Sequence, residues 1–182
     1  LRVKGGGPSL VVAPKSLLYN WLAEAARFAP KLRVLQHHGG DRTRGTDHFA
    51  DHDVILTTYA TMRVDIEYLA ATEFEYAILD EAQAIKNSSA QTAKAARLLR
   101  ARHRLALSGT PLENHLGELW SIFDFLNPGM LGTARQFSRT FAGKSVPAER
   151  REVLARAIRP MLLRRTKEQV ARDLPARTEQ TL

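Results

Sequence analysis

Asp80 and Glu81 are adjacent carboxylates that follow a short apolar run, residues 76–79, and precede a helix-prone segment. This arrangement is typical of a buried parallel strand that delivers acidic side chains to the carboxyl edge of its sheet. Because strand side chains alternate in direction, the two acids point different ways and can perform different tasks. In nucleotide hydrolysis, one carboxylate holds Mg²⁺, often through water, and a second orients or deprotonates the attacking water. The pair alone is equally compatible with a strand end whose acids are solvated or cap the next helix.

Short apolar runs alternate with segments of helical spacing along the first part of the chain, which indicates a parallel sheet with crossover helices. The fold class predicted by this pattern is a three-layer α/β sandwich with a mainly parallel sheet. The predicted strands are residues 9–13, 33–36, 54–57, 76–80 and 104–107, and the predicted helices between them are residues 17–28, 62–69 and about 89–100.

After residue 111 the pattern changes to helices alone, at residues 116–126, 134–142 and 149–158. Ser16 is placed to cap the first helix of the chain, and Ser88 or Ser89 to cap the helix after the carboxylate pair. Trp21 and Trp120 fall at apolar helical spacings, which predicts core positions for both.

Polar residues or glycines follow every predicted strand. The carboxyl ends of parallel strands meet at one edge of a sheet, where ligands bind. Hydroxyls, backbone amides at helix starts and lysine side chains are groups that hold phosphate oxygens. Each group alone is compatible with a cap or a turn, but five of them on one edge of a basic protein indicate a phosphate-binding edge. The groups are Pro14-Lys15-Ser16, Gly39-Gly40, Thr57-Thr58-Tyr59, Asp80-Glu81 and Ser108-Gly109-Thr110.

The composition narrows the class of protein. The chain has 182 residues, 44% of them hydrophobic, a formal net charge of +8 and no cysteine. This length fits one domain, or one domain and the start of another. The lack of cysteine excludes disulfides and thiolate metal sites, which fits an intracellular protein. No apolar run approaches the roughly 20 residues needed to cross a bilayer, so we expect no membrane partner. The positive net charge favours a polyanionic partner, and nucleic acid is the first candidate. The alternative is that the charge serves only to keep the protein soluble.

Two further patterns bear on phosphate binding. Arg159, Arg164 and Arg165 surround an apolar run, and are either a solvated face or a group of guanidinium ions that meets phosphate. A phosphate loop of the form G-x-x-x-x-G-K-[ST] would be the usual companion of an Asp-Glu pair. The sequence does not contain one, because the nearest match, Gly143-Lys144-Ser145, has Ser138 where the first glycine is required.

Taken together, these residues resemble the Swi/Snf-type DNA translocases, the chromatin-remodelling and related ATPases of helicase superfamily two. The resemblance runs over nearly the whole chain, and the stretch from Leu119 to Gly129 is more specific to the family than the Asp-Glu pair. The matching segments are residues 10–18 with Trp21 for motif Ia, Thr57-Thr58-Tyr59 for motif Ib, Asp80-Glu81-Ala82-Gln83 with residues 85–87 for motif II, residues 107–114 for motif III, and residues 159–167 for the close of the first lobe.

The resemblance implies a RecA-like first lobe with a helical insertion after motif III. By match to motif II, Asp80 would serve Mg²⁺, through water, and Glu81 would polarise the water that attacks the γ-phosphate of ATP. Gln83 would contact motif III, in which Ser108, Gly109 and Thr110 would relay hydrolysis to DNA. The residues implied along double-stranded DNA are Pro14, Lys15, Ser16, Thr57, Thr58, Arg164 and Arg165.

Two parts of the family pattern lie outside the sequence: the phosphate loop and the second RecA-like lobe. We therefore expect a lobe truncated at its amino end over residues 1–165, with about 112–158 helical, and the start of the connection to the second lobe at 166–182. Such a sheet has an open edge, which predicts either self-association or cover by a helix. A DNA translocase would be cytoplasmic or nucleoid-associated in a bacterium and nuclear in a eukaryote. The alternatives are a non-catalytic DNA-binding or docking module and an RNA helicase of the same superfamily.

Overall fold

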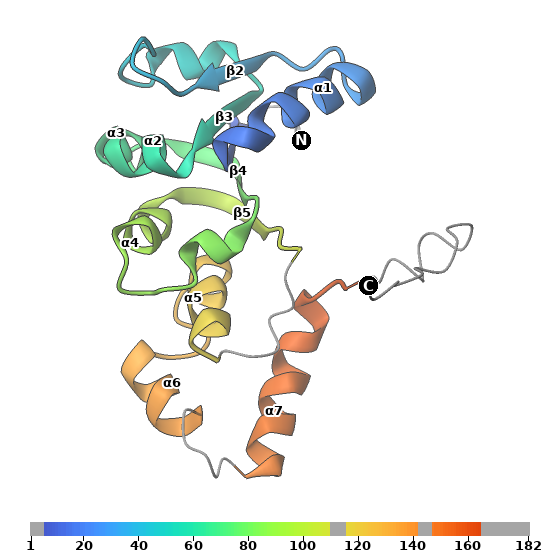
Figure 1. The fold of residues 1–182 in the computed structure, drawn as a ribbon, viewed down its shortest axis with the longest axis vertical. Helices are drawn as coiled ribbons and strands as arrows, with labels where there is room; N and C mark the ends of the chain where they lie inside the picture. Colours follow the sequence, from blue (N-terminus) through green and yellow to red (C-terminus); the bar gives the residue numbers. More distant parts are fainter. Residues whose placement is uncertain (1–5, 110–115, 142–146, 165–182) are drawn as a thin grey trace, which may run out of the picture. The chain divides into compact units, whose positions relative to one another are not determined.

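The computed structural model describes residues 6–109, 116–141 and 147–164. The chain forms two compact units, residues 1–142 and 143–182. The first unit contains the sheet and most of the helices (Figure 1). Its strands are β1 (Ser9–Ala13), β2 (Val34–His37), β3 (Val54–Thr58), β4 (Glu73–Leu79) and β5 (Arg100–Ala106); its helices are α1 (Leu18–Phe28), α2 (Tyr59–Val64), α3 (Ile66–Leu69), α4 (Gln91–Leu98), α5 (Leu116–Leu126) and α6 (Ala134–Phe141).

The sheet has the strand order β2-β3-β1-β4-β5, and all four neighbouring pairs are parallel. From β1 in the middle of the sheet the chain passes to β2 at one edge, returns to β3 beside β1, and then crosses to the other side of β1 for β4 and β5. The predicted parallel α/β fold is confirmed, and the sheet is entirely parallel in the described residues.

Alternation along the strands divides the core into two layers, one on each face of the sheet. Leu10 and Val12 face a cluster that includes side chains of α2, α3, α4 and α5, whereas Val11 and Ala13 face a cluster that includes α1. Helices therefore cover both faces, as a three-layer sandwich requires. Because both faces are covered, the central strands carry continuous apolar runs, and all five residues of β1 are buried.

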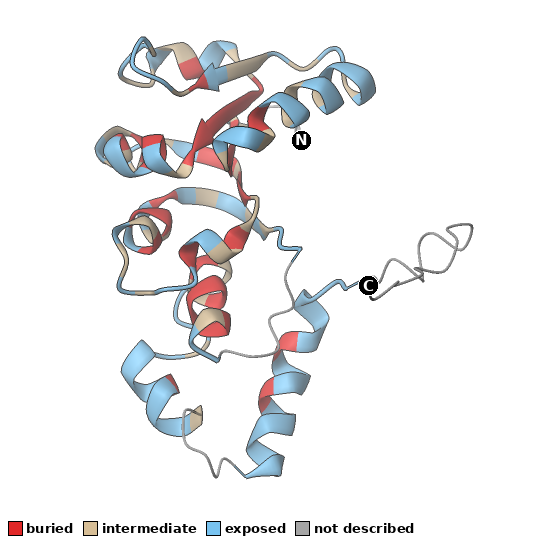
Figure 2. Cartoon of the chain, in the orientation of Figure 1, coloured by how far each residue is buried: buried red, intermediate tan, exposed pale blue. Residues whose placement is uncertain are grey.

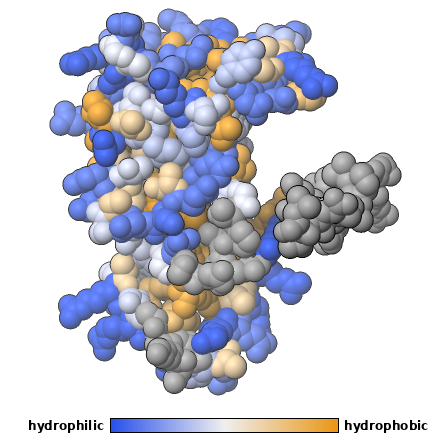
Figure 3. All heavy atoms as spheres, in the orientation of Figure 1, coloured by the Kyte–Doolittle hydropathy of each residue, from blue (hydrophilic) through white to orange (hydrophobic). Residues whose placement is uncertain are grey.

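The sheet differs between its centre and the β5 edge. Figure 2 shows the buried colour on β3 and the exposed colour over much of β5. Leu105 and Leu107 are 44% and 36% exposed. In the part of Figure 3 that holds the sheet, hydrophilic side chains cover most of the visible face, and apolar ones lie between them in small groups. Isolated exposed apolar side chains of this kind are common on folded proteins.

Three local expectations were wrong. A 3₁₀ turn, Lys15–Leu17, precedes α1, so Leu17 and not Ser16 stands at its cap. Helix α4 begins after Ala90 without a side-chain cap, because Ser89 instead donates to the side chain of Asn87. Strand β5 begins at Arg100, four residues earlier than its apolar run suggested. The first four residues of β5, Arg-Ala-Arg-His, include no large apolar side chain, so this part of the edge strand gives no hydrophobic signal.

The predicted helices after residue 111 are confirmed where the structure describes them. Helix α5 carries a buried face that includes Trp120, as predicted, and it is tied to the segment after β4 by the Ser121 hydroxyl, which donates to the Ile85 carbonyl at 2.5 Å. The second unit contains α7 (Ala148–Ile158), followed by the turn Arg159–Met161. None of the helices in the described ranges combines the length and the apolar composition that crossing a membrane requires.

Replacing Phe125 by alanine tests whether α5 belongs to the core of the sheet unit. Phe125 is fully buried in the cluster on the α2–α5 face. Loss of its ring should lower the free energy of unfolding by about 3–5 kcal/mol, measured by urea denaturation. The matched control is Phe28→Ala, because Phe28 is 71% exposed at the end of α1. This control should change stability by less than about 0.5 kcal/mol. Equal losses in both variants would contradict the assignment.

Candidate functional site

The order of the strands places the change in chain direction between β1 and β4, because β2 and β3 lie on one side of β1 and β4 and β5 lie on the other. In open parallel sheets, ligands bind at the carboxyl edge beside such a switch point. The backbone amide of Asp80 donates to the Val12 carbonyl at 2.8 Å, which fixes the acid beside the end of β1. Asp80 and Glu81 therefore lie where an open parallel sheet binds its ligands.

The two carboxylates are held in different ways. Asp80 comes directly after β4 and its Oδ1 accepts from the amide of Glu81 at 2.9 Å. Glu81 has φ 50° and ψ 54°, and is the one non-glycine residue of the described ranges with a positive φ. This left-handed conformation is disfavoured for a side chain with a Cβ and costs about 1–3 kcal/mol. Hydrogen bonding of the Ala82 amide to the Leu107 carbonyl at 2.8 Å holds the strained turn in place.

Two aromatic residues complete the environment of Asp80. The Trp21 indole N–H donates to Asp80 Oδ2 at 2.8 Å, and the Tyr59 hydroxyl donates to the Asp80 carbonyl, also at 2.8 Å. Trp21 is partly buried and packs against the core cluster on the α1 face, as predicted, but its indole N–H has a second task at Asp80 that the sequence did not indicate. Burial, with the charges of Asp80 and Glu81, raises the pKa of Tyr59 and keeps it a proton donor. A tryptophan can pack its ring in the core or donate its N–H to a polar group, and helical spacing alone does not distinguish these two roles.

A chain of hydrogen bonds joins Glu81 to the segment after β5. The Gln83 amide donates to Glu81 Oε2 at 2.6 Å, and the Ser108 hydroxyl donates to Gln83 Oε1 at 3.1 Å. The structure thus brings together three of the residues singled out in the sequence, and Gly109 follows directly. Thr110 lies outside the described residues.

Asp80 fits a water-mediated Mg²⁺ site. Its side chain is only half-buried, and each carboxylate oxygen accepts one hydrogen bond from the protein and has a further lone pair. Mg²⁺ keeps several of its waters and is usually bound through one or two carboxylates together with substrate phosphates. Asp80 would hold the ion in this manner, and the ion would supply positive charge next to a phosphate.

The predicted DNA-binding residues fall into exposed and buried sets. Lys15 and Ser16 are exposed in the turn after β1, next to the half-buried Pro14. Thr57 and Thr58 are buried: the Thr57 hydroxyl donates to the His37 carbonyl at 2.7 Å, and Thr58 caps α2 by accepting from the Thr61 amide at 3.1 Å. Arg164 is exposed in the second unit, and Arg165 lies outside the described residues. Their contact with DNA stays a prediction.

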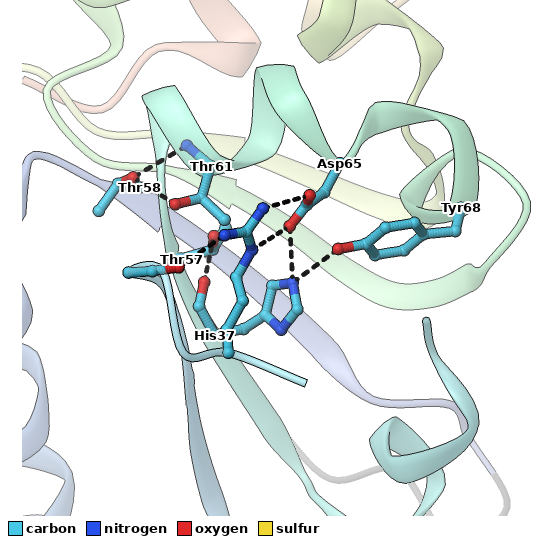
Figure 4. A network of polar contacts seen from close by, with 8 residues as sticks. His37, Thr57, Thr58, Thr61, Asp65 and Tyr68 are labelled. Atoms are coloured by element: carbon cyan, nitrogen blue, oxygen red, sulfur yellow. Dashed lines mark hydrogen bonds and ion pairs between the residues drawn. The ribbon is translucent and has the colours of Figure 1, made fainter. Parts of the chain in front are cut away.

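A buried polar cluster lies behind the threonines (Figure 4). We call His37, Arg42, Asp65 and Tyr68 the Asp65 cluster. His37 Nε2 lies 3.0 Å from Asp65 Oδ2 and 3.2 Å from the Tyr68 hydroxyl. Arg42 donates to both oxygens of Asp65 at 2.5 Å and to the Gly39 carbonyl at 2.6 Å. The side chains of His37 and Asp65 are 1% and 4% exposed, so these bonds are shielded from water.

The charges within the Asp65 cluster follow from burial and hydrogen bonding. Burial opposes ionisation of Asp65, but the hydrogen bonds from Arg42, Tyr68 and His37 outweigh it and lower its pKa to about 2. Burial lowers the pKa of His37 more than Asp65 raises it, so the imidazole is neutral at pH 7. Because ionised Asp65 only accepts, the nitrogen of His37 that faces it carries the proton. Burial and the bond to Asp65 raise the pKa of Tyr68 to about 12.

Comparison with known proteins identifies the class to which this fold and site belong. A family model described as SNF2-related domain matches residues 3–182, and the chain belongs to this family. The structure is similar to the solved structure of the Sulfolobus solfataricus SWI2/SNF2 ATPase core in complex with dsDNA, with a TM-score of 0.82 and 42% sequence identity. The match covers 94% of this chain and 37% of the solved one. The sheet unit thus corresponds to a RecA-like lobe of such a core.

Two curated relatives show how far the family extends. YwqA of Bacillus subtilis (strain 168), a helicase/translocase by name, is 44% identical over 192 residues, which cover 99% of this chain. TATA-binding protein-associated factor MOT1 of Saccharomyces cerevisiae is 42% identical over 185 residues and 92% of the chain. The chain spans 21% of the length of the first and 10% of the second.

A double-mutant cycle tests the bond between Trp21 and Asp80. Trp21→Phe removes the indole N–H and retains most of the ring, and Asp80→Asn removes the charge that this N–H meets. A hydrogen bond to a charged group contributes about 1.5–3 kcal/mol, so the coupling energy in urea denaturation should be about 1 kcal/mol or more. The control pair is Trp120→Phe with Asp80→Asn, because the Trp120 N–H donates to the Gly132 carbonyl instead. Coupling of equal size in both cycles would contradict a direct bond.

The Asp65 cluster predicts a defined loss of stability in acid. The pKa of Asp65 is lower in the folded chain, about 2, than its ordinary value of 3.8. Ionised Asp65 therefore stabilises the fold above pH 4 by about 2 kcal/mol, and this contribution disappears as the pH falls from about 4 to about 2. The difference in free energy of unfolding between the wild type and Asp65→Asn should shrink as the pH falls from about 4 to about 2, the range in which Asp65 itself titrates. A difference that grows over this range would refute this assignment.

Proposed function

We propose that the chain is the first-lobe portion of an ATP-dependent double-stranded DNA translocase. The observation that carries the proposal is the position of Asp80 and Glu81 beside the end of β1, at the point where the strand order changes direction, in a chain that belongs to the SNF2-related family. The solved relative named as an ATPase core was determined with double-stranded DNA, which supports DNA over RNA as the substrate for movement.

The geometry supports separate tasks for the two acids. Asp80, anchored by Trp21 and by the amide of Glu81, keeps one orientation and would hold Mg²⁺ through water. Glu81 would accept a proton from the water that attacks the γ-phosphate. The Glu81 carboxylate accepts from Gln83, whereas the Asp80 carboxylate accepts from Trp21 and from the Glu81 amide, so the protein already binds the two carboxylates through different partners. Preorganisation of this kind is common where strain is retained at a site.

Gln83 and Ser108 would transmit the change between bound ATP and its hydrolysis products to the rest of the lobe. Gln83 donates to Glu81 and accepts from Ser108, so a shift of the glutamate changes both bonds. The Trp21 bond is a second route, because α1 follows the turn that carries Lys15 and Ser16. Movement at Asp80 would thereby reach the segment proposed to lie along one DNA strand, to which Pro14, Thr57, Thr58, Arg164 and Arg165 would also contribute.

Turnover requires more than these residues. The sequence has no G-x-x-x-x-G-K-[ST] loop, and the chain spans about a fifth of YwqA. We propose that a phosphate loop and a second RecA-like lobe elsewhere in the full protein close over ATP with this unit, as lobes do in enzymes that act by domain closure. Such an enzyme would act at the nucleoid of a bacterium or in the nucleus of a eukaryote. The exposed edge strand β5 is the surface that self-association would use.

Replacing Glu81 by glutamine in the full-length protein tests the proposed base. The substitution keeps the size and the bond to Gln83 but removes proton acceptance. ATP turnover stimulated by duplex DNA should fall roughly 10²- to 10⁴-fold. Glu73→Gln is the matched control, because Glu73 is exposed at the opposite end of the same strand, and should leave turnover unchanged. Turnover that duplex DNA does not stimulate in the wild type would favour a binding or docking module instead.

The isolated 182-residue chain should show no significant ATP turnover, with or without DNA. Half of the phosphate-binding groups and the partner lobe are absent from it under this proposal, so the transition state has too few groups to stabilise its charge. Phosphate release by the purified chain is the measurement. Release that persists in the wild-type chain and disappears in Glu81→Gln would show that the chain suffices alone.

A further inference from the structure

The Asp65 cluster lies at the ends of β2 and β3, and takes no part in the contacts around Asp80. It contains one ionised acid, one arginine, a neutral imidazole and a neutral phenol, so its net charge is zero. Replacing a buried ion pair by apolar groups is often neutral or stabilising, so burial of this pair is poorly explained by stability alone. A set of directional bonds does, however, fix the relative positions of the segments that it joins.

The cluster joins two segments at the ligand edge of the sheet. The first is the turn after β2, where Gly39 has φ 85° and Arg42 donates back to its carbonyl. The second is the start of α2, where Thr58 provides the cap; Asp65 stands where α2 ends. Arg42 and His37 bind Asp65 from the first segment, and Thr57 binds the His37 carbonyl from the second. Each segment therefore holds the other.

The contacts of Arg42 distinguish it from the basic residues proposed to meet DNA. All three of its guanidinium nitrogens donate within the protein, two to Asp65 and one to Gly39. Its side chain is 12% exposed, whereas Lys15 is exposed at the end of β1. An arginine that contacts phosphate must direct donors into solvent. In Arg42, by contrast, each of the three nitrogens already donates to an oxygen of the protein.

We propose that the Asp65 cluster is a positioning device that holds residues 39–42 and the start of α2 in the arrangement that meets duplex DNA, and that Arg42 acts through Asp65 and not on a phosphate. The inference rests on the proposed DNA-translocase function. It assigns positioning roles to His37, Arg42, Asp65 and Tyr68. Thr57 is completely buried and its hydroxyl donates to the His37 carbonyl, so Thr57 also has a positioning role and presents no surface of its own to DNA.

The direction in which Asp65→Asn changes DNA affinity distinguishes this proposal from a purely electrostatic effect. Asp65→Asn removes a negative charge from a protein that binds a polyanion, and charge alone would then strengthen DNA binding. Loss of positioning predicts the reverse, because Arg42 loses its charged partner and the two segments are no longer held. We expect DNA affinity to fall about tenfold, within the range reached by residues that act indirectly.

The matched control lies at the other end of the same two strands. Asp53 has a side chain that is 3% exposed and pairs with Arg33 through Oδ1 at 3.1 Å, just before β2 and β3 begin. Asp53→Asn therefore removes a buried carboxylate from an Arg–Asp pair of the same kind, but at the edge opposite the ligands. It should lower the unfolding temperature and leave DNA affinity unchanged.

The experiment measures binding of the full-length protein to a fluorescent duplex at several salt concentrations, well below the unfolding temperature of each variant. Tyr68→Phe is the second cluster variant, and it leaves every charge in place. It should weaken DNA binding by a smaller factor than Asp65→Asn, and it tests the proposal if Asp65→Asn does not fold. Arg42→Ala should weaken binding without changing the slope of log K against log salt, whereas loss of a phosphate contact lowers that slope by about one.

The outcomes are distinct. Weaker binding by the cluster variants with an unchanged salt slope, while Asp53→Asn binds normally, supports the proposal. Unchanged or tighter binding by Tyr68→Phe and Asp65→Asn overturns it, as does a slope lowered by about one in Arg42→Ala. If the wild type itself does not bind duplex DNA, the proposed function has failed first, and the positioning role falls with it for that separate reason.

Discussion

The parallel pairing of β1 with strands on both of its sides is the constraint on which the rest of the structure depends. Its five residues are buried, and its end is the point at which the chain changes direction across the sheet. Covalent connectivity then sends α1 to one face and α2, α3 and α4 to the other. The acids after β4 and the basic turn after β1 become neighbours for this reason alone, although 64 residues separate Ser16 from Asp80 in the sequence.

Several polar groups along this edge are held by hydrogen bonds to other protein groups. Asp80, Glu81 and Gln83 each have a defined partner, and the threonines after β3 are anchored in the same way. Such bonds add modestly to net stability, because the unfolded chain is equally well bonded to water. Their effect is on position: a site that handles phosphate charge gains from groups that need not reorganise when the charge arrives.

The sequence predicted the parts of the fold that burial determines. The central strands appear as apolar runs because both faces of the sheet are covered, and Asp80 and Glu81 stand out against such a run. β5 was placed only in part, since an edge strand with Arg100, Arg102 and His103 lacks that signal. The partners of Trp21 and Thr57, and the bonds from His37 and Arg42 to Asp65, were not predictable, because each partner lies 20 or more residues away and is chosen by packing.

Trp21 has a consequence of a practical kind. It is one of two tryptophans in the chain, and its indole N–H touches the carboxylate proposed to hold the metal. The other, Trp120, is buried in α5 with its N–H on a backbone carbonyl. Trp21 can therefore serve as an intrinsic fluorescent probe of the site. With Trp120 changed to phenylalanine, all tryptophan emission from this chain would originate next to Asp80. The binding of a nucleotide could then be followed there without any added dye.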